Sequence, residues 1–504
     1  MGDHRRGLVT ETTILIFLRR KDKTMKKTIS LLLSLLLVLP LALWSCAAGT
    51  GEGEEPAAAP TIVPNAEEQP AETEFNWYAS LPEGADFGGY TFTVIRYQDK
   101  TWNVYIAPEE MTGEVLNDAA YQRNLEVEDL VDIKVEELCD GSYEGDFKNV
   151  VKAGESETYD LICFWCPGER ASYITGNLVY DWQALEGLDL GARWYNQSAN
   201  ETYRLGKKQY FAVSDLTFPV QQHFRLLFNK ELMTQMGLSY PYEAVYNGEW
   251  TYDRLLTYSK DAYADLNGNG KADKDDRYGM AMNAAYISGF GFNFGELPMY
   301  WDEEGFRFNL VSDRIVRIVE LMQALRADPD VFFTTNGNEQ YKVFEAGNAL
   351  FEGYGSDPVL LRDLEFDFGY LPYPKLDETD DYTIWTVGGM MAAPITLNDP
   401  LRTGTIVEVL SAGSNKYVVD AFIEQYVEGK ILRDEDSKNI YRMMREKAIC
   451  DLSYNVDPSG MLGEYKYFAK FVNDPTASPA SYAQSIMKVV NKTYQKMLDQ
   501  MNGD

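Results

Sequence analysis

The sequence of 504 residues predicts an α/β fold built around a parallel sheet. Residues 90–96 and 131–135 are rich in β-branched and aromatic side chains, as strands are, and residues 116–130 between them have the pattern of a helix. A second helix near residues 147–153 leads into an apolar run at residues 159–165, which indicates a third strand. Strands that alternate with helices favour a parallel sheet with crossover connections.

Each element has a local signal of its own. The first strand follows a Gly-Gly break and reads YTFTVIR, and residues 131–135 alternate apolar and polar side chains as a half-buried strand does. Farther along, the chain becomes richer in helices. Residues 314–327, for example, carry apolar side chains at helical spacing: Ile315, Ile318, Val319, Met322 and Leu325.

The charge balance argues against several classes of protein. The chain has 78 acidic and 46 basic side chains, which gives a formal net charge of −32. Proteins that bind nucleic acid or anionic lipid need a basic surface instead. It has two histidines, and His4 lies in the leader described next, so His223 is the histidine left for chemistry. This scarcity argues against a His-ligated zinc site and weakens the case for a serine or cysteine hydrolase.

The first 45 residues have the pattern of a processed leader. After Met25, two lysines precede an apolar run at residues 29–44, which is short for a membrane span and typical of a signal peptide. The run ends in Leu-Trp-Ser-Cys, which resembles the bacterial lipobox, so we expect cleavage before Cys46 and diacylation of that cysteine. An ordinary signal peptide with a chance cysteine is the alternative. Residues 1–24 are interpreted as an upstream extension.

Residues 46–86 are interpreted as a lipidated, disordered linker, because residues 47–75 consist largely of Ala, Gly, Pro and Glu with almost nothing to bury. An ordered domain is expected over residues 87–504. No second apolar run of about 18 residues follows, so the lipid would be the membrane attachment. The predicted location is extracytoplasmic, on the outer face of a bacterial cell membrane.

Five segments resemble motifs of one family, and they occur in the family's order. Residues 160–182 (DLICFWCPGERASYITGNLVYDW) resemble the first ligand loop of maltodextrin-type solute-binding proteins. Residues 206–213 with 226–232 resemble the family's pair GK-x-Y-x-x-P and L-x-Y/F-N-K-D/E-L, and residues 248–255 resemble its helix start W-T-x-x-E/D-L. Residues 344–350 resemble its F-x-x-G-x-A segment, and residues 368–375 resemble its G-x-x-P-x-P segment. From residue 87 to about residue 451, the chain is identified as similar to the family 1 extracellular solute-binding proteins, the capture subunits of ABC sugar importers.

The resemblance implies two α/β lobes joined by crossing strands, as in type II periplasmic binding proteins, with a ligand cleft that closes on binding. Lobe 1 would hold about residues 87–218 and 385–412, and lobe 2 about residues 221–375 and much of 413–504. The implied function is capture of a carbohydrate, with an oligosaccharide favoured, and its delivery to the permease subunits of an ABC transporter. A monomer without catalytic activity is expected.

Sugars present apolar C–H faces and a rim of hydroxyls, so their sites need flat aromatic rings with carboxylate, amide or guanidinium groups. The resemblance places Trp165 at the end of the third strand, where it would stack on a sugar, with Glu169 and Arg170 on its hydroxyls. A core Trp beside a solvated ion pair is the alternative. Trp250 begins a helix and is expected in the core. Three further ligand candidates, with turn or core roles as the alternative, are Tyr354, Asp357 and Trp385, and Asp215 after the strand pattern at residues 210–213 is another.

The sharpest local signal is the loop at residues 265–276, DLNGNGKADKDD, which fits the D-x-N-x-N-G pattern of a calcium-binding loop. Alginate- and sugar-binding members of the family carry a similar loop with a structural role. Asp276 stands where the usual loop has Glu, which predicts weaker binding or a bridging water, and an Asn/Gly-rich turn without metal is the alternative. The predicted ligands of a structural Ca²⁺ ion are Asp265, Asn267, Asn269, the Lys271 carbonyl, Asp273 and Asp276.

The remaining cysteines and His223 are expected to have structural roles. Cys163 and Cys166 have CxxC spacing, but Cys163 lies inside a strand and not at the start of a helix. Two thiols or a strained local disulfide are therefore expected in place of a redox site. Cys139 and Cys450 would pair only if the fold brings them together, and His223 is expected to be packed or at the surface.

Two other functions would use the same features. A surface glycoside hydrolase needs two carboxyls about 5–10 Å apart, and the acidic chain could hold such a pair, but no acid stands out in an apolar setting that would raise its pKa. A glycan-docking lipoprotein outside transport would bind without closing its lobes. Catalytic turnover and closure on binding distinguish the three functions.

Overall fold

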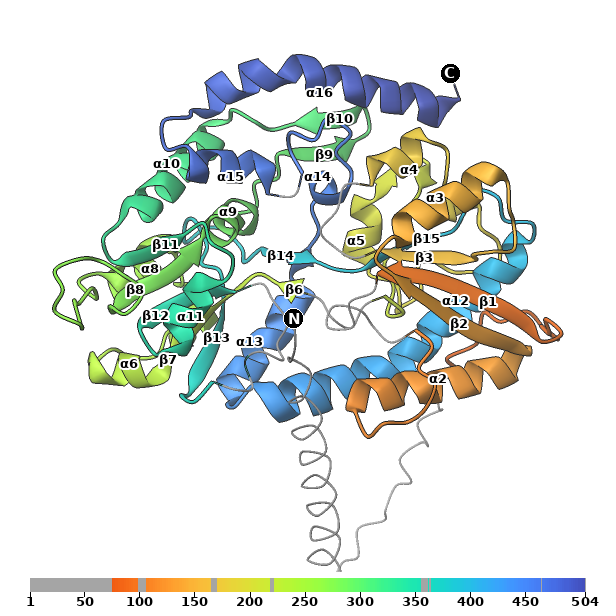
Figure 1. The fold of residues 1–504 in the computed structure, drawn as a ribbon, viewed down its shortest axis with the longest axis horizontal. Coiled ribbons are helices and arrows are strands. Elements are labelled where there is room, and N and C mark those ends of the chain that lie inside the picture. Colours follow the sequence, from red (N-terminus) through yellow and green to blue (C-terminus); the bar gives the residue numbers. More distant parts are fainter. Residues whose placement is uncertain are drawn as a thin grey trace, which may run out of the picture. The chain divides into compact units, whose positions relative to one another are not determined.

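The computed structural model describes residues 75–97, 106–164, 170–217, 222–354, 361, 364–463 and 465–503. Five residues with predicted roles lie outside these ranges: Cys46, Trp165, Cys166, Glu169 and Asp357. From residue 75 onward the described chain forms two α/β lobes, each built on its own sheet, and three short strands that connect the lobes (Figure 1).

Lobe 1 contains a four-stranded sheet made of β1 (Tyr90–Tyr97), β2 (Ile133–Asp140), β3 (Leu161–Phe164) and β15 (Met390–Ala392). The order is β15-β3-β1-β2, and β1 pairs in parallel with both β2 and β3. Tyr90 lies opposite Ile133, and Val94 lies opposite Leu161. Strand β15 returns from far along the chain and pairs antiparallel with β3. The predicted parallel strands at the start of the domain are confirmed.

Helices α2 (Val115–Val131) and α3 (Tyr143–Ala153) make the crossovers of this sheet, as predicted. Gly154 ends α3 with a φ of 79°, a conformation that glycine adopts without strain. The core of the lobe includes the buried side chains of Phe92 and Trp182. The remaining elements are short: α4 (Ala171–Thr175), η1 (Trp182–Ala184), α5 (Gln197–Thr202), β4 (Arg204–Leu205) and β5 (Lys208–Gln209).

Lobe 2 contains a five-stranded sheet made of β7 (Arg225–Asn229), β8 (Tyr278–Asn283), β11 (Val331–Thr334), β12 (Ala349–Tyr354) and β13 (Phe368–Pro372). The order is β11-β8-β12-β7-β13; β8 is parallel to both of its neighbours, and β7 is antiparallel to both of its own. The other elements are α6 (Lys230–Gln235), α7 (Tyr242–Tyr246), α8 (Tyr252–Ser259), α9 (Ala284–Asn293), β9 (Met299–Asp302), β10 (Gly305–Phe308), α10 (Asp313–Ala327) and α11 (Glu339–Glu345). The apolar face predicted for α10 is buried, from Ile315 to Leu325.

Three short strands form a connecting sheet: β6 (Gln222–His223), β14 (Ile384–Val387) and β16 (Ala448–Ile449). Strand β14 lies in the middle, parallel to β16 and antiparallel to β6. Figure 1 shows β6 and β14 between the two larger sheets. Because β6 leads into β7 of lobe 2 and β14 leads into β15 of lobe 1, the chain passes from one lobe to the other at this sheet.

The carboxy-terminal part adds helices to both lobes. Helix α12 (Pro400–Ser414) packs against α2 of lobe 1 and continues as two π-helical segments, η3 (Asn415–Val419) and η4 (Ala421–Ile431). Asp399 begins α12, since its carboxylate accepts a hydrogen bond from the Arg402 N–H at 3.0 Å, and Pro400 occupies the first turn. Helix α13 (Glu435–Glu446) then packs against β13 of lobe 2.

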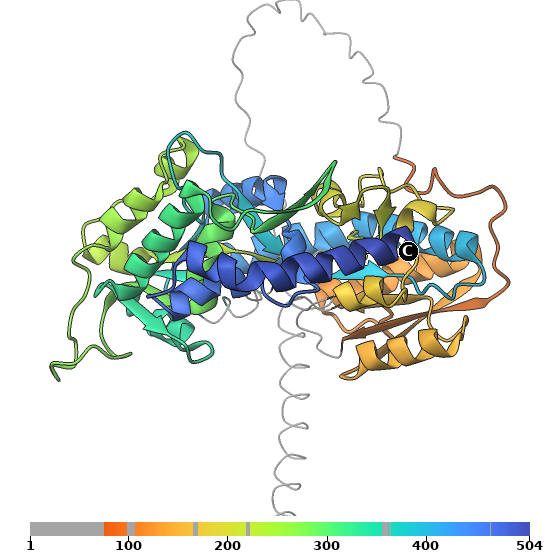
Figure 2. The same cartoon turned by 90° about the horizontal axis from the view of Figure 1, so that it is seen from above.

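After α14 (Leu452–Asn455) and α15 (Lys466–Asn473), the last long element is α16 (Pro479–Asn502). Helix α16 packs against α4 of lobe 1 and α10 of lobe 2, and it passes over both lobes in Figure 1 and in Figure 2. Its Tyr494 ring lies 4.7 Å from the Phe306 ring of β10, measured between centroids. No helix in the described ranges is both long and apolar enough to cross a bilayer.

Candidate functional site

Two strands that the sequence associates with ligand binding end beside segments outside the described residues. Strand β3 ends just before Trp165 and Glu169, and β12 ends at Tyr354, just before Asp357. In the sheet register Tyr354 lies opposite Arg225 of β7. The ligand roles of these four candidates stay predictions.

Arg170 is held inside lobe 1, just before α4. Its side chain is 4 % exposed, its Nη2 lies 3.3 Å from Glu144 Oε1, and its guanidinium lies 4.9 Å from the centre of the Phe164 ring. Its backbone N–H donates a hydrogen bond to the carbonyl oxygen of Asn455 in α14, at 2.6 Å. The protein itself engages this guanidinium, and a contact with sugar hydroxyls stays a prediction.

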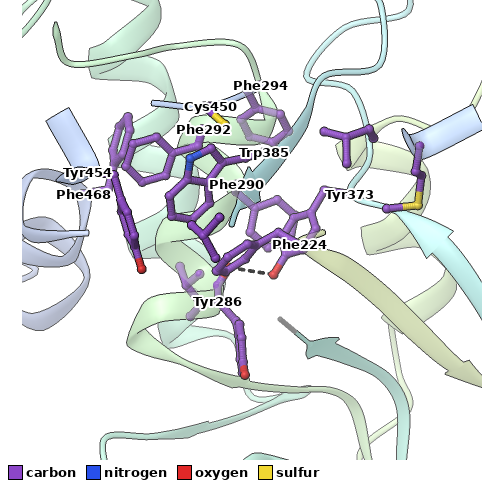
Figure 3. Packing of buried hydrophobic residues seen from close by; sticks show 14 of the residues in the cluster. Phe224, Tyr286, Phe290, Phe292, Phe294, Tyr373, Trp385, Cys450, Tyr454 and Phe468 are labelled. Atoms are coloured by element: carbon purple, nitrogen blue, oxygen red, sulfur yellow. Dashed lines mark hydrogen bonds between the residues drawn. The ribbon is translucent and has the colours of Figure 1, made fainter. Parts of the chain in front are cut away.

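Trp385 lies in β14 of the connecting sheet, and its side chain is fully buried. Figure 3 shows aromatic rings packed around it. The Phe292 ring stacks on the indole at 4.2 Å between centroids and 18° between planes. The three other closest rings are those of Phe224, Tyr454 and Tyr465, at 4.4, 5.2 and 5.3 Å. We call these five residues the connecting cluster. In this cluster Trp385 is a core residue, which is the alternative to a sugar-stacking role.

Asp215 lies in lobe 1, where its carboxylate accepts a hydrogen bond from the Asn415 side-chain amide at 2.6 Å. Burial raises the pKa of Asp215 to about 7, although this hydrogen bond and the charges of Arg445 and Arg193 favour the ionised form. The residue is partly exposed, and its contact ties lobe 1 to the first turn of η3. A ligand role for Asp215 stays a prediction.

The interior holds acids that the sequence prediction missed. Glu352 of β12 is fully buried, and burial raises the pKa of its carboxyl well above the usual range, against the charge of Arg225. The glutamate inside the apolar strand ALFEGY was the available signal. Asp451 is also buried, accepts a hydrogen bond from the Ser453 hydroxyl at 2.6 Å, and has its pKa raised by burial to about 7. The expectation that no acid stands in an apolar setting was wrong.

These two acids do not form an accessible pair. Glu352 is 0 % exposed and Asp451 is 1 % exposed, so neither reaches a substrate in this structure. Glycoside hydrolysis needs two carboxyls that face the scissile bond. The raised pKa values of Glu352 and Asp451 therefore give no support to the hydrolase alternative.

The predicted calcium loop folds as a series of tight turns. The Asp265 carboxylate accepts hydrogen bonds from the backbone N–H groups of Gly268 and Gly270, at 2.7 and 2.8 Å. Both glycines have positive φ, 70° and 72°, which explains why glycine stands at these positions. At the far end of the loop, Asp276 is fully buried and accepts a hydrogen bond from the Leu266 N–H at 3.1 Å.

The middle of the loop is closed by its own amides. The side-chain amides of Asn267 and Asn269 donate hydrogen bonds to Asp273, the shortest at 2.6 Å, and the Lys271 N–H donates to Asn269 at 2.7 Å. In the part of the chain that the structure describes, no group of three or more His, Cys, Asp or Glu side chains is arranged to hold a metal ion. The loop has the oxygen donors that calcium prefers, but in this conformation its carboxylates do not converge on one point where an ion could bind.

The structure also places the described cysteines of the domain, His223 and Trp250. Cys163 is a buried free thiol whose pKa burial raises to about 12, so it lacks the reactive thiolate of a redox site. Cys139 is exposed in β2, whereas Cys450 is buried near Trp385 (Figure 3). His223 of β6 is fully buried, which lowers the pKa of its imidazole to about 3. Trp250 is in the core, as predicted.

Comparison with known proteins gives matches in structure and none in sequence. No family model matches the chain, and no curated protein matches it. A cyclo/maltodextrin-binding protein complexed with maltotetraose shares 15 % identity and a TM-score of 0.58, over 82 % of this chain and 99 % of that chain. The maltose/maltodextrin-binding domain of Bdellovibrio bacteriovorus bound to maltotriose shares 16 % identity and a TM-score of 0.52, over 80 % of this chain and 100 % of that one.

A third structure is the GacH receptor of Streptomyces glaucescens, solved unliganded and in complex with acarbose. It shares 15 % identity and a TM-score of 0.51, over 81 % of this chain and 99 % of that chain. All three are binding proteins, and each is matched over almost its whole length. Together with the two sheets and the connecting strands, these matches show that the chain has the two-lobed α/β fold of the maltodextrin-type solute-binding proteins.

Proposed function

We propose that this protein captures a carbohydrate in a cleft between its lobes and delivers it to the permease subunits of an ABC transporter. The observation that carries the proposal is the fold, which covers almost the whole length of proteins whose structures hold maltotetraose and maltotriose. The resemblance of residues 160–182 to the family's first ligand loop adds support, since β3 leads into this segment. We propose an oligosaccharide as the ligand and a monomer without catalytic activity as the active form.

A melting-temperature screen across mono- and oligosaccharides tests this function. A ligand that binds the native state alone stabilises it by mass action, by about 2.7 kcal/mol at a hundred times its Kd. At saturation the radius of gyration from small-angle scattering is expected to fall, because the lobes close. Shorter sugars released at catalytic rates would establish the hydrolase instead. Binding with an unchanged radius of gyration would establish the glycan-docking protein.

We also propose that a lipid on Cys46 tethers the protein to the outer face of the bacterial cell membrane. The support is the lysine-led apolar run that ends in Leu-Trp-Ser-Cys. The substitution Cys46→Ser is expected to move the protein from the membrane fraction to the soluble extracytoplasmic fraction, because no thiol is left to acylate. Cys139→Ser, at an exposed cysteine of the domain, is the matched control. A Cys46→Ser protein that stays with the membrane would contradict the anchor.

Calcium binding at residues 265–276 is proposed as a structural feature of the same protein. The support is the all-oxygen donor set and the turns that Gly268 and Gly270 make possible. Because the Asn267 and Asn269 amides donate to Asp273, binding requires these two side chains to turn their oxygens toward the ion. This rearrangement and the Asp at the last position both predict weak binding.

The calcium proposal predicts that millimolar Ca²⁺ raises the melting temperature above that in EDTA, since a bound ion stabilises the native state. Asp265→Ala is expected to abolish this response, because it removes the first ligand of the loop. Asp275→Ala is the control, because it removes the same charge from an exposed side chain outside the predicted ligand set. A melting temperature that EDTA and Ca²⁺ leave unchanged would show that the loop is a turn without metal.

A further inference from the structure

A pocket on lobe 2 lies apart from the connecting sheet. It has a volume of about 580 Å³ and is lined by α7, α8, the segments that precede each of these helices, and Asp436 of α13. None of the described residues that line this pocket comes from lobe 1 or from the connecting strands β6, β14 and β16. The volume falls within the roughly 300–1,000 Å³ of small-molecule sites. We call it the α7–α8 pocket.

Two exposed tyrosine rings line this pocket. Tyr240 is 40 % exposed and Tyr246 is 50 % exposed, whereas large aromatic side chains are usually more buried. Tyr246 is held in place, because its hydroxyl donates a hydrogen bond to the Asp436 carboxylate at 2.9 Å. Tyr240 packs edge-on against Tyr242, with 6.2 Å between ring centroids. Rings that are exposed and already fixed offer flat apolar faces at little cost in entropy.

The polar groups of the pocket include both acceptors and donors. Glu243 and Glu249 supply carboxylates, Arg254 supplies a guanidinium, and all three are exposed. Within the described ranges, their side chains make no hydrogen bond or ion pair, so they are available to a ligand. Hydroxyl groups donate and accept hydrogen bonds, so a neutral polyhydroxylated molecule can use both kinds of partner.

An internal lysine already lies on two of the aromatic rings that line the pocket. Lys230 Nζ lies 5.4 Å from the centre of the Tyr240 ring and 5.5 Å from that of Tyr242, and it pairs with Asp434 at 2.8 Å. The protein thus already places its own ammonium group on these two rings. An anionic ligand would meet the carboxylates of Glu243, Glu249 and Asp436. A sugar meets neither obstacle.

We propose that the α7–α8 pocket is a second carbohydrate-binding site. A sugar ring stacks on Tyr246, and its hydroxyls bind the carboxylates of Glu243 and Glu249 and the guanidinium of Arg254. The site is separate from the ligand between the lobes and does not depend on it. A long glycan that touches the protein at two places is held at a higher local concentration than a ligand with a single contact.

Hydrogen exchange measured by mass spectrometry locates the site on the full domain. The probes are four sugars, maltotetraose, cellotetraose, xylotetraose and mannotetraose, and the polyamine spermidine as a cationic comparison, each at millimolar concentration. At least one of them is expected to slow exchange in peptides covering residues 239–258. Titration calorimetry with that probe then gives its affinity for the wild type. Tyr246→Ala is expected to weaken the pocket binding about tenfold, because the stacking ring is lost.

Tyr300→Ala is the matched control, because Tyr300 of β9 is 45 % exposed and lies outside the pocket. It is expected to leave the affinity unchanged. A sugar that raises the melting temperature but leaves residues 239–258 unprotected would overturn the second site and not the proposed transport function. Protection by spermidine and by none of the four sugars would also overturn it. Protection that persists unchanged in Tyr246→Ala would overturn the stacking role.

Discussion

The substitution Trp385→Ala is expected to lower the free energy of unfolding by about 3–5 kcal/mol, the usual cost of truncating a buried aromatic side chain to alanine. Trp385 is fully buried, and the rings of Phe292 and Phe224 lie 4.2 and 4.4 Å from it, so the cavity would open at the centre of the connecting cluster. Denaturation by guanidinium chloride, followed by circular dichroism, measures the loss.

Trp385→Phe is the control for this prediction. Phenylalanine keeps a ring in the cluster and removes the indole N–H, which is buried without a hydrogen-bond partner within the described residues. The cost of the smaller ring is therefore partly offset by the loss of an unsatisfied donor, and we expect a change of about 1 kcal/mol. Equal losses in the two variants would contradict this account, since they would mean that a ring kept in the connecting cluster contributes nothing to stability.

The second large effect is a fall in stability as the pH rises between about 4 and 7. The carboxyl of Asp451 has an ordinary pKa of 3.8 and a pKa of about 7 when buried in the native state. In this window the unfolded chain has released the proton and the folded chain has kept it, so raising the pH favours unfolding. Because the native pKa lies about three above the unfolded one, the free energy of unfolding is expected to fall by on the order of 4 kcal/mol across this window. Asp215 adds to the same slope, and the two carboxyls together outweigh His223, which burial keeps neutral with a pKa of about 3 and which has the opposite slope up to about pH 6.5.

Asp451→Asn tests the origin of this slope, because asparagine remains neutral and can still accept a hydrogen bond from Ser453. Melting temperatures at pH 5 and pH 8 are expected to lie closer together in Asp451→Asn than in the wild type. Glu320→Gln, at an exposed acid of α10, is expected to leave the difference unchanged. A wild-type melting temperature that rises from pH 5 to pH 8 would contradict the prediction.

The local patterns of the sequence were sufficient to predict the first strands and the first helix of the domain. β1 and β3 appear where the alternating and apolar runs predicted strands, and α2 where the helical pattern stood, because each is specified by neighbouring residues. The second predicted strand begins at Ile133, later than expected, because α2 extends to Val131. The two-lobed arrangement needed the resemblance of separated motifs, since the pairing of β15 with β3 joins segments more than two hundred residues apart.

The site was harder to predict because burial depends on contacts between distant segments. Trp385 was a ligand candidate, but its neighbours Phe292 and Tyr454 come from elements far apart in the chain. Arg170 was paired in the sequence with its neighbour Glu169, whereas the structure places it beside Glu144 of α3. The α7–α8 pocket had no signal of its own, because nothing in the sequence shows that Tyr240 and Tyr246 are exposed.

Helix α16 has a mechanical consequence for any movement of the lobes. Its 24 residues form a stiff rod of about 36 Å that is fastened to α4 on one side and to α10 on the other. The lobes can swing apart only by pivoting around this rod or by detaching it from one of them. Its far end is tied to lobe 1 by the Lys208 ammonium, which donates a hydrogen bond to the Met501 carbonyl. A helix that packs against both lobes limits how far they can separate, so shortening α16 is expected to change the separation of the lobes.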